Sequence, residues 1–231
     1  MTPISFKRHR FPPAIIQHAV WLYARFTLSF RDVEDLLAVR AIDVSNETVR
    51  RWFLKFGRLI ARNLRRSRPR ASARWHLDEM VIKIRGRKYW LWRAVDDEGE
   101  VLDFLVQRRR CARSARILLR KLLKKQGFAP ERITTDKLKS YAVAIRIERL
   151  NATHDQELRA NNRAENSHRP VRRRERKHQR FKSPGSAQRF LSIHAAVYNT
   201  FYVQRHLLPR HIFKTFRAET LAVWRQSCLA A

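Results

Sequence analysis

The sequence predicts a mixed α/β protein in which an all-α segment precedes a part built on a β-sheet. Over residues 12–66 the apolar side chains recur at helical spacing. From Trp75 the pattern changes to a period of two, which is typical of a half-buried strand. Two further strand patterns follow, and then helical patterns with one short strand among them. A chain of 231 residues with 44% hydrophobic side chains has room for a core in each part.

The first part is expected to contain three helices. The two prolines at 12–13 can open the first helix, because proline suits the first helical turn. Ser29 can cap the second, and a short break at 41–44 ends it. Either Ser45 or Asn46 can then cap the third helix, which is rich in arginine and aromatic residues.

Helix, short break and basic helix are the outline of a helix-turn-helix, whose second helix enters the major groove of DNA. An ordinary pair of antiparallel helices would give the same outline, but the basic side chains of the third helix favour the DNA-binding interpretation. We therefore expect residues 1–66 to form a DNA-binding domain with a basic tail to 74. The expected contacts in the third helix are Asn46, Thr48, Arg50, Arg51 and Lys55.

The charge balance points to a polyanionic partner. Lys and Arg number 51 against 20 Asp and Glu, which gives a net charge of +31. Nucleic acid is the leading candidate and an anionic membrane surface the second. Two cysteines exclude a disulfide framework and a four-cysteine zinc site, and they suit a reducing cytoplasm. The absence of a long apolar run or signal sequence predicts a cytoplasmic protein without a membrane partner.

A run of arginines over residues 61–74 follows the third helix. It could be a solvated tether, but its uniform positive charge favours contact with a phosphate backbone. The candidate contacts are Arg65, Arg66, Arg68 and Arg70.

The second part, residues 75–231, is expected to be one α/β domain with C-terminal helices. Its predicted order is three antiparallel strands, a helix, a strand and then helices. The strands are expected over 75–84, 88–95, 101–106 and 132–135, and the helices over 113–126, 137–150, from 161 onward and over 186–206.

Three acidic residues in this part occupy informative positions. Asp78 shares a strand face with Met80, where a carboxylate is costly unless it is paired or binds a metal, while Glu79 points to the other face. Asp136 comes directly after the short fourth strand, where open sheets place functional side chains. Glu165 lies near the start of a later helix.

Carboxylates from these three elements can converge on one point, and divalent metal removes their mutual repulsion. Two such ions can serve in-line phosphoryl transfer, and oxygen ligands suit Mg²⁺ or Mn²⁺ rather than zinc. Spacing alone leaves open that these are ordinary surface acids, and it leaves Asp103 and Glu148 as competitors.

Four separated motifs resemble the core of bacterial insertion-sequence transposases of family six, in the order in which that family has them. They are Trp-His-Leu-Asp-Glu at 75–79, Tyr-Trp-Leu-Trp-Arg-Ala-Val-Asp at 89–96, Thr-Asp-Lys-Leu-Lys-Ser-Tyr at 135–141 and Asn-Asn-Arg-Ala-Glu-Asn-Ser-His at 161–168. The resemblance runs from about Phe11 to Arg225, which is nearly the whole chain.

The resemblance implies a ribonuclease-H-like domain whose catalytic, metal-binding residues are Asp78, Asp136 and Glu165, with two Mg²⁺ ions for which Mn²⁺ can substitute. It implies that the N-terminal helices read the terminal inverted repeats of an element. It also implies double-stranded DNA as substrate and target, a homodimer or higher oligomer on DNA, and a nucleoid-associated bacterial protein. The reaction would be DNA cleavage followed by strand transfer. A non-catalytic DNA-binding regulator or decayed transposase, and a nuclease of the same fold, remain alternatives.

The sequence also departs from the family. The 28 residues between Asp136 and Glu165 are fewer than is usual there. Glycine is common in the family where Ala41 and Ala142 stand, and a left-handed backbone at either position would cost alanine about 1 kcal/mol.

The predicted helix from residue 161 carries many basic residues, which are candidates for DNA contact. Arg172, seven residues after Glu165, is the expected DNA contact, although Pro170 is expected to kink or end the helix between them. His76 and His168 could support the acidic residues or belong to the core.

Overall fold

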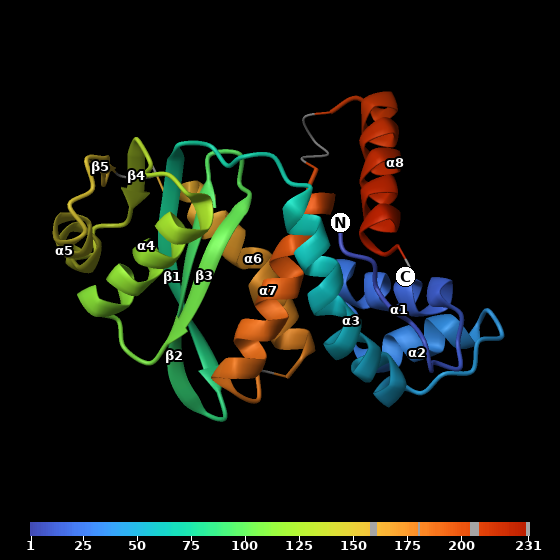
Figure 1. The fold of residues 1–231 in the computed structure, drawn as a ribbon. Coiled ribbons are helices and arrows are strands. Elements are labelled where there is room, and N and C mark those ends of the chain that lie inside the picture. Colours follow the sequence, from blue (N-terminus) through green and yellow to red (C-terminus); the bar gives the residue numbers. More distant parts are fainter. Residues whose placement is uncertain (158–160, 180, 204–207, 230–231) are drawn as a thin grey trace. The chain divides into compact units, whose positions relative to one another are not determined.

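The computed structural model of the protein describes residues 1–157, 161–179, 181–203 and 208–229, and it has helical and mixed α/β parts, as predicted (Figure 1). The chain divides into two compact units. One contains residues 1–68 together with 192–231, and the other contains residues 69–191. Residues 192–231, which we expected to belong to the same domain as the sheet, therefore group with the N-terminal helices.

The three predicted N-terminal helices are present, as α1 (Pro13–Arg25), α2 (Phe30–Ala38) and α3 (Asn46–Arg66). Ser29 caps α2 in a reciprocal capping box: its hydroxyl accepts from the Asp32 amide at 3.1 Å, and the Asp32 carboxylate accepts from the Ser29 amide at 2.8 Å. Of the two candidate caps of α3, Ser45 is the one that accepts a backbone hydrogen bond.

Aromatic residues and one buried amide hold the first unit together. Tyr23 stacks on Phe30 with ring centroids 4.0 Å apart, and it meets Phe53 of α3 edge to face. The Asn63 side chain, 2% exposed, accepts from the Thr2 amide and donates to carbonyls near both ends of the chain. One of those carbonyls belongs to Ser227, the last residue of α8 (Arg210–Ser227). Asn63 of α3 therefore connects both terminal segments of the chain within this unit.

Only one of the two alanines is in the left-handed backbone region. Ala41, in the break between α2 and α3, has a φ of 55°. Ala142 lies inside helix α5 (Lys139–Ile147), where alanine is the best residue. The suspected strain therefore exists at Ala41, and the concern about Ala142 was wrong.

The second unit contains a five-stranded mixed sheet in the order β3-β2-β1-β4-β5. β1 pairs antiparallel with β2, and β2 with β3, whereas β1–β4 and β4–β5 are parallel. The strands are β1 (Arg74–Ile84), β2 (Arg87–Asp96), β3 (Val101–Gln107), β4 (Arg132–Thr135) and β5 (Thr153–Asp155). The expected order omitted β5, because three residues are too few to show a period.

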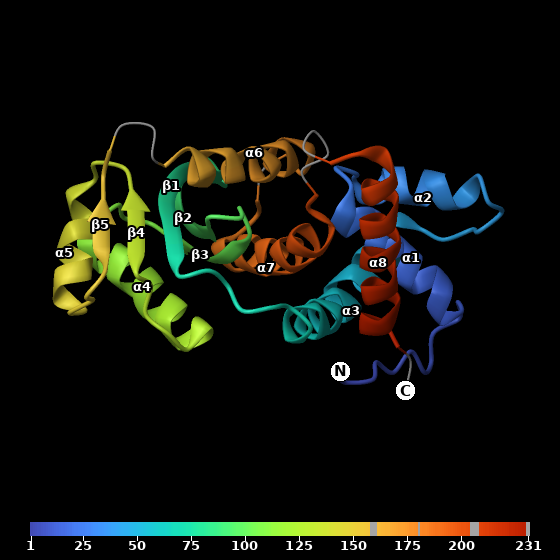
Figure 2. The same ribbon diagram turned by 90° about the horizontal axis from the view of Figure 1, so that it is seen from above.

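Helices cover both faces of this sheet (Figures 1 and 2). α4 (Ala112–Gln126) ends at residue 126 as expected and is followed by the left-handed Gly127. It packs with α5 on one face over a core that includes Trp75, Trp92 and Tyr141. α6 (Asn162–Lys177) contacts β1 and β2. The sheet therefore presents alternate residues of β1 to α5 and to α6.

Two helix predictions need correction or a limit. Pro170 does not end α6, which continues to Lys177 because one face, including Ala164 and Val171, is buried. The helix expected over 186–206 is α7 (Pro184–Phe201), and residues 204–206 of that prediction lie outside the described residues.

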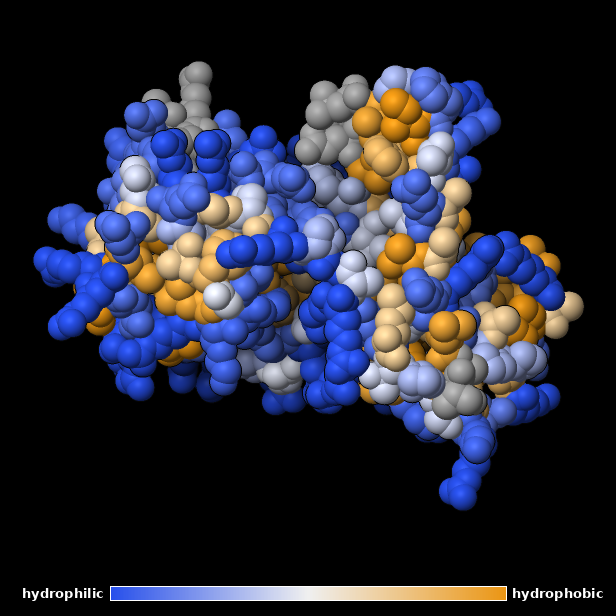
Figure 3. All heavy atoms as spheres, turned by 45° about the horizontal axis from the view of Figure 1, so that its top comes forward, coloured by the Kyte–Doolittle hydropathy of each residue, from blue (hydrophilic) through white to orange (hydrophobic). Residues whose placement is uncertain are grey.

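Figure 3 shows a mainly hydrophilic exterior in one view, with apolar side chains exposed in several places, α8 among them. Within the described residues, no helix is both long enough and apolar enough to cross a membrane.

Candidate active site

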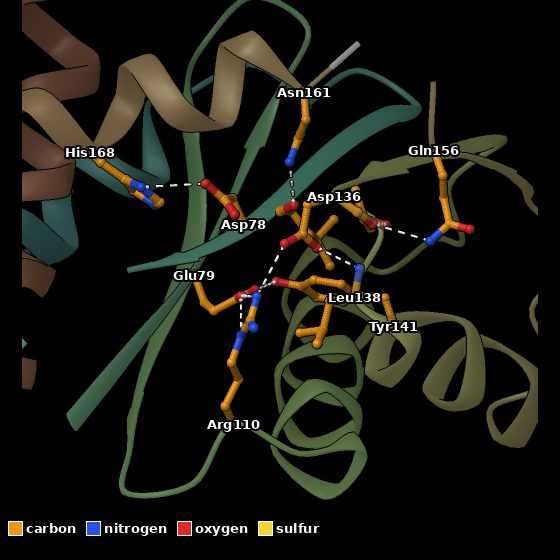
Figure 4. Close-up of polar contacts among 11 residues, drawn as sticks. Asp78, Glu79, Arg110, Asp136, Leu138, Tyr141, Gln156, Asn161 and His168 are labelled. Carbon is orange, nitrogen blue, oxygen red and sulfur yellow. Dashed lines mark hydrogen bonds and ion pairs between the residues drawn. The ribbon is translucent and has the colours of Figure 1, made fainter. Parts of the chain in front are cut away.

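The topology brings Asp78 and Asp136 together. β1 and β4 are neighbouring parallel strands in which Leu77 pairs with Thr135. The residues that follow this pair are Asp78 and Asp136, so both carboxylates lie at the same place on the sheet. Oxygens of Asp78, Asp136 and Glu79 all lie within 4.8 Å of one another (Figure 4).

The Asp136 carboxylate is oriented by its own loop and by an arginine. One oxygen accepts from the Leu138 amide at 3.1 Å, and the other accepts from Arg110 Nη2 at 3.2 Å. The backbone carbonyl of Asp136 accepts from Gln156 at 3.1 Å. These contacts hold the loop after β4 in a defined conformation (Figure 4).

Glu79 is the site residue that sequence reasoning underestimated. It projects toward α5, opposite to Asp78 as the alternation predicts, and accepts from the Tyr141 hydroxyl at 2.8 Å. Arg110 Nε donates to its other oxygen at 2.6 Å. The side chain is 1% exposed, yet its carboxylate belongs to the acidic group. The available signal was that both faces of this strand carry apolar neighbours, which makes every carboxylate on it costly.

Burial and neighbouring charge perturb Asp78 strongly. Burial is the largest cause, and the charges of Glu79, Asp136 and Glu165 add to it, so that the pKa of Asp78 rises to about 7. The Nδ1 atom of His168 lies 3.5 Å from its carboxylate. Burial lowers the pKa of His168 to about 3, which leaves this partner neutral.

Glu165 lies near this group but outside it. It is exposed in the first turn of α6, and its charge contributes to the raised pKa of Asp78. The start of α6 is fixed to β1, because the Asn161 side chain donates to the Leu77 carbonyl at 2.8 Å. The structure thus brings together two of the three predicted acids and places the third within electrostatic reach.

The two competing acids have basic partners on α4. Asp103 lies 3.1 Å from Lys121 and 3.5 Å from Lys125. Glu148 pairs with two arginines of that helix, Arg116 and Arg120. Each is therefore neutralised where it stands.

Three of the expected DNA contacts in α3 already have acidic partners within their unit. Asn46 donates to Glu34 at 2.8 Å. Arg50 binds Glu47 through both Nε and Nη2, and Arg51 lies 3.3 Å from the same carboxylate. These hydrogen bonds, that of Arg50 first, lower the pKa of Glu47 to about 2. Sequence reasoning did not single out Glu47.

The other α3 candidates have polar neighbours. Thr48 is partly exposed beside its cap residue, with its hydroxyl 3.0 Å from that of Ser45. The Lys55 ammonium lies 2.9 Å from the imidazole of His9. Arg66, at the end of α3, donates to Thr2.

The rest of the basic tail is partly engaged in packing. Arg65 is partly buried and donates to the backbone oxygen and the hydroxyl of Ser192. The guanidinium of Arg70 lies over the ring of Phe128, 4.2 Å from its centroid. Arg68 is partly exposed.

Arg172 lies on α6 beside the end of β1. It donates to the Val81 carbonyl at 2.6 Å and pairs with Glu175 at 3.2 Å, while 43% of its side chain stays exposed. It lines an open groove of about 720 Å³ together with Val81, Lys83, Glu175, Arg176 and Gln179.

Comparison with known proteins identifies the family. The model of a family described as a DDE domain, of the IS240 type, matches residues 72–204, which is more than half of the chain. The chain belongs to this DDE domain family. The residues that match include both aspartates of the acidic group, and the resemblance to insertion-sequence transposases of family six is confirmed.

This DDE domain protein is also similar to curated proteins and to proteins of solved structure. It is 34% identical over 140 residues to the transposase for the insertion sequence-like element IS431mec of Staphylococcus aureus, and 33% identical to that for IS257 in transposon Tn4003 of the same species. Each match covers 61% of this chain and 62% of the relative. The magnesium complex of the HTLV-2 integrase catalytic core domain is similar with a TM-score of 0.44 at 14% identity, covering 59% of this chain and 90% of that one.

Proposed function

We propose that this protein is a DDE transposase that cleaves DNA at the ends of an insertion sequence and joins the freed 3′-hydroxyl to target DNA. The observation that carries the proposal is the convergence of Asp78 and Asp136, from neighbouring strands, within a chain of the DDE domain family. The curated relatives are named as transposases of insertion-sequence elements, which supports the same activity. We also propose that the mixed sheet is of the ribonuclease-H-like type, as the motif resemblance implies.

The acidic group suits a hard divalent cation. Its ligands are carboxylate oxygens, which favour Mg²⁺ or Mn²⁺ over softer metals. The pKa of Asp78 is raised because its carboxylate is buried beside other acids without enough positive charge nearby. A bound dication would supply that charge. Asp78 and Asp136 would hold the metal jointly, and Glu165 would complete the shell of a second ion. When bound, such ions activate the attacking oxygen and stabilise the leaving oxygen of an in-line displacement.

The chain's own residues position these ligands. The Leu138 amide orients Asp136, and His168 contacts Asp78 as a neutral imidazole, so it adds no charge that competes with a cation. In this mechanism no protein side chain forms a covalent intermediate. The rate comes from positioning and from charge stabilisation.

DNA binding is the second element of the proposal. The helices α2 and α3 would form the helix-turn-helix that reads the terminal inverted repeats, and Arg172 would contact DNA near the acidic group. Because two ends of an element must be joined together, the active form would be a homodimer or a higher oligomer on double-stranded DNA.

The test is strand cleavage and transfer by the full-length protein on DNA from the ends of its element, with Mg²⁺ or Mn²⁺. Asp78→Asn, Asp136→Asn and Glu165→Gln should each abolish both steps while repeat binding persists. Glu98→Gln, at an exposed acid in the turn after β2, is the matched control and should leave activity unchanged. Cleavage without joining would indicate a nuclease, and specific binding without cleavage would indicate a regulator. Either result would overturn the proposal.

A further inference from the structure

Arg110 bridges two members of the acidic group. It lies in the loop between β3 and α4, with its guanidinium 5.1 Å from the ring centroid of Trp90. Its Nε and Nη2 atoms lie 2.6 Å and 2.5 Å from one oxygen of Glu79, and the same Nη2 lies 3.2 Å from Asp136. Figure 4 shows the guanidinium directed at both carboxylates. A positive side chain therefore already contacts a proposed metal ligand.

The contacts of Arg110 are unequal. Two of its nitrogens engage Glu79 at short distances, whereas one of them makes the longer contact with Asp136. The second oxygen of Glu79 is occupied by the Tyr141 hydroxyl, so both of its oxygens are in use. A carboxylate that is 1% exposed and hydrogen-bonded on both oxygens is costly to pull away from its partners.

We infer that Glu79 is a positioning residue that sequesters Arg110, and thereby keeps Asp136 available to a divalent cation. If Glu79 lost its charge, Asp136 would be the acid that Arg110 already contacts, and arginine favours paired hydrogen bonds to a carboxylate. It would then bind Asp136 more closely, neutralise it and repel an incoming dication. The inference rests on the proposed function only in taking Asp136 as a metal ligand.

A double-mutant cycle in metal affinity tests this role without any measurement of catalysis. The full-length protein is titrated with Mn²⁺, and free Mn²⁺ is followed by electron paramagnetic resonance. Glu79→Gln should weaken binding by about fivefold or more, because Arg110 turns to Asp136. Arg110→Gln alone should tighten binding about two- to threefold, because it removes a cation near the ligands. The double variant should bind at least as tightly as the wild type.

Arg109→Gln is the matched control, because it removes the same charge from the neighbouring exposed residue, and it should change the affinity little. If Glu79 were itself a ligand, the double variant would stay as weak as Glu79→Gln, and that result overturns the inference. Equal affinity in all variants overturns it as well. If the Glu79 variants do not fold, the Arg110→Gln variant decides the question, because the Arg110 side chain is 38% exposed and its replacement should not prevent folding. Unchanged or weaker Mn²⁺ binding by this variant refutes the inference.

The same titration separates this inference from the proposed function. A wild-type protein that binds no Mn²⁺ would contradict the metal site and both proposals with it. A wild-type protein that binds Mn²⁺ and loses it in Asp136→Asn, while the cycle shows no rescue, would refute the role of Glu79 alone.

Discussion

Replacing Asp78 by asparagine should stabilise the metal-free protein at neutral and alkaline pH. Asp78 is 9% exposed and is surrounded by other carboxylates, so the charged form is disfavoured. Asparagine has nearly the same shape and cannot ionise. The substitution therefore removes the cost of the buried charge and leaves the packing beside His168 almost unchanged.

The size of the effect follows from the pKa of Asp78, which is about 7 in the folded chain against an ordinary value of 3.8. Between these values the folded state holds a proton that the unfolded state has released, so wild-type stability falls as the pH rises through this window. A gap of about three pKa units at 1.36 kcal/mol each corresponds to at most about 4 kcal/mol above pH 7. The advantage of Asp78→Asn should therefore grow by about 2–3 kcal/mol between pH 5 and pH 8.

Urea unfolding of both proteins in EDTA at several pH values measures this difference, and Glu98→Gln serves again as the control. Mg²⁺ should reduce the advantage of the variant at pH 8, because it binds the folded wild type and stabilises it. A stability difference that does not depend on pH would refute the reasoning, as would a variant that is less stable than the wild type at pH 8 without metal.

Three further predictions concern the two alanines, Asn63 and the arginines at the end of α3. Ala41→Gly should stabilise the protein by up to about 1 kcal/mol in urea unfolding, because it relieves a left-handed alanine, whereas Ala142→Gly inside α5 should destabilise it by about 1 kcal/mol. Asn63→Ala should cost about 2–3 kcal/mol, since it removes the partner of one buried and two partly buried backbone groups, and a loss below 0.5 kcal/mol would contradict this. Arg66→Gln should make the salt dependence of DNA binding shallower by about 0.9 in log–log slope, with repeat and random DNA weakened alike, and an unchanged slope would support the solvated tether. Arg65→Gln should mainly lower stability, because Arg65 binds Ser192.

Much of the fold could be predicted because its signals are local. The cap at Ser29, the stop at Gly127 and the period of two in β1 each depend on a few consecutive residues, and each is present in the structure. β5 and the grouping of residues 192–231 with the N-terminal helices depend on contacts between distant residues. No local pattern encodes such contacts, so they were not predicted.

The candidate site divides in the same way. Strand position and the family motifs led to Asp78 and Asp136, and parallel pairing of their strands brings them together. Alternation gave the correct side of the strand for Glu79 but suggested that it matters less than Asp78. A period of two does not show how far a long side chain reaches, so the contact of its carboxylate with the acidic group was missed. No sequence pattern pointed to Arg110, because it lies in a loop within a run of arginines. Its role follows only from its contacts with the carboxylates of Glu79 and Asp136.

The charge balance explains why Asp78 stands out. In a chain with 51 basic and 20 acidic residues, most carboxylates should find a cation, and among the described residues six acids form ion pairs with arginines or lysines: Glu47, Glu79, Asp103, Asp136, Glu148 and Glu175. Asp78 instead lies against a histidine that stays neutral and beside carboxylates that oppose its ionisation. The cation of the proposed function would remove this cost, because it would supply the positive charge that Asp78 lacks. The local cost at Asp78 is thus itself an argument for metal-dependent chemistry at this sheet.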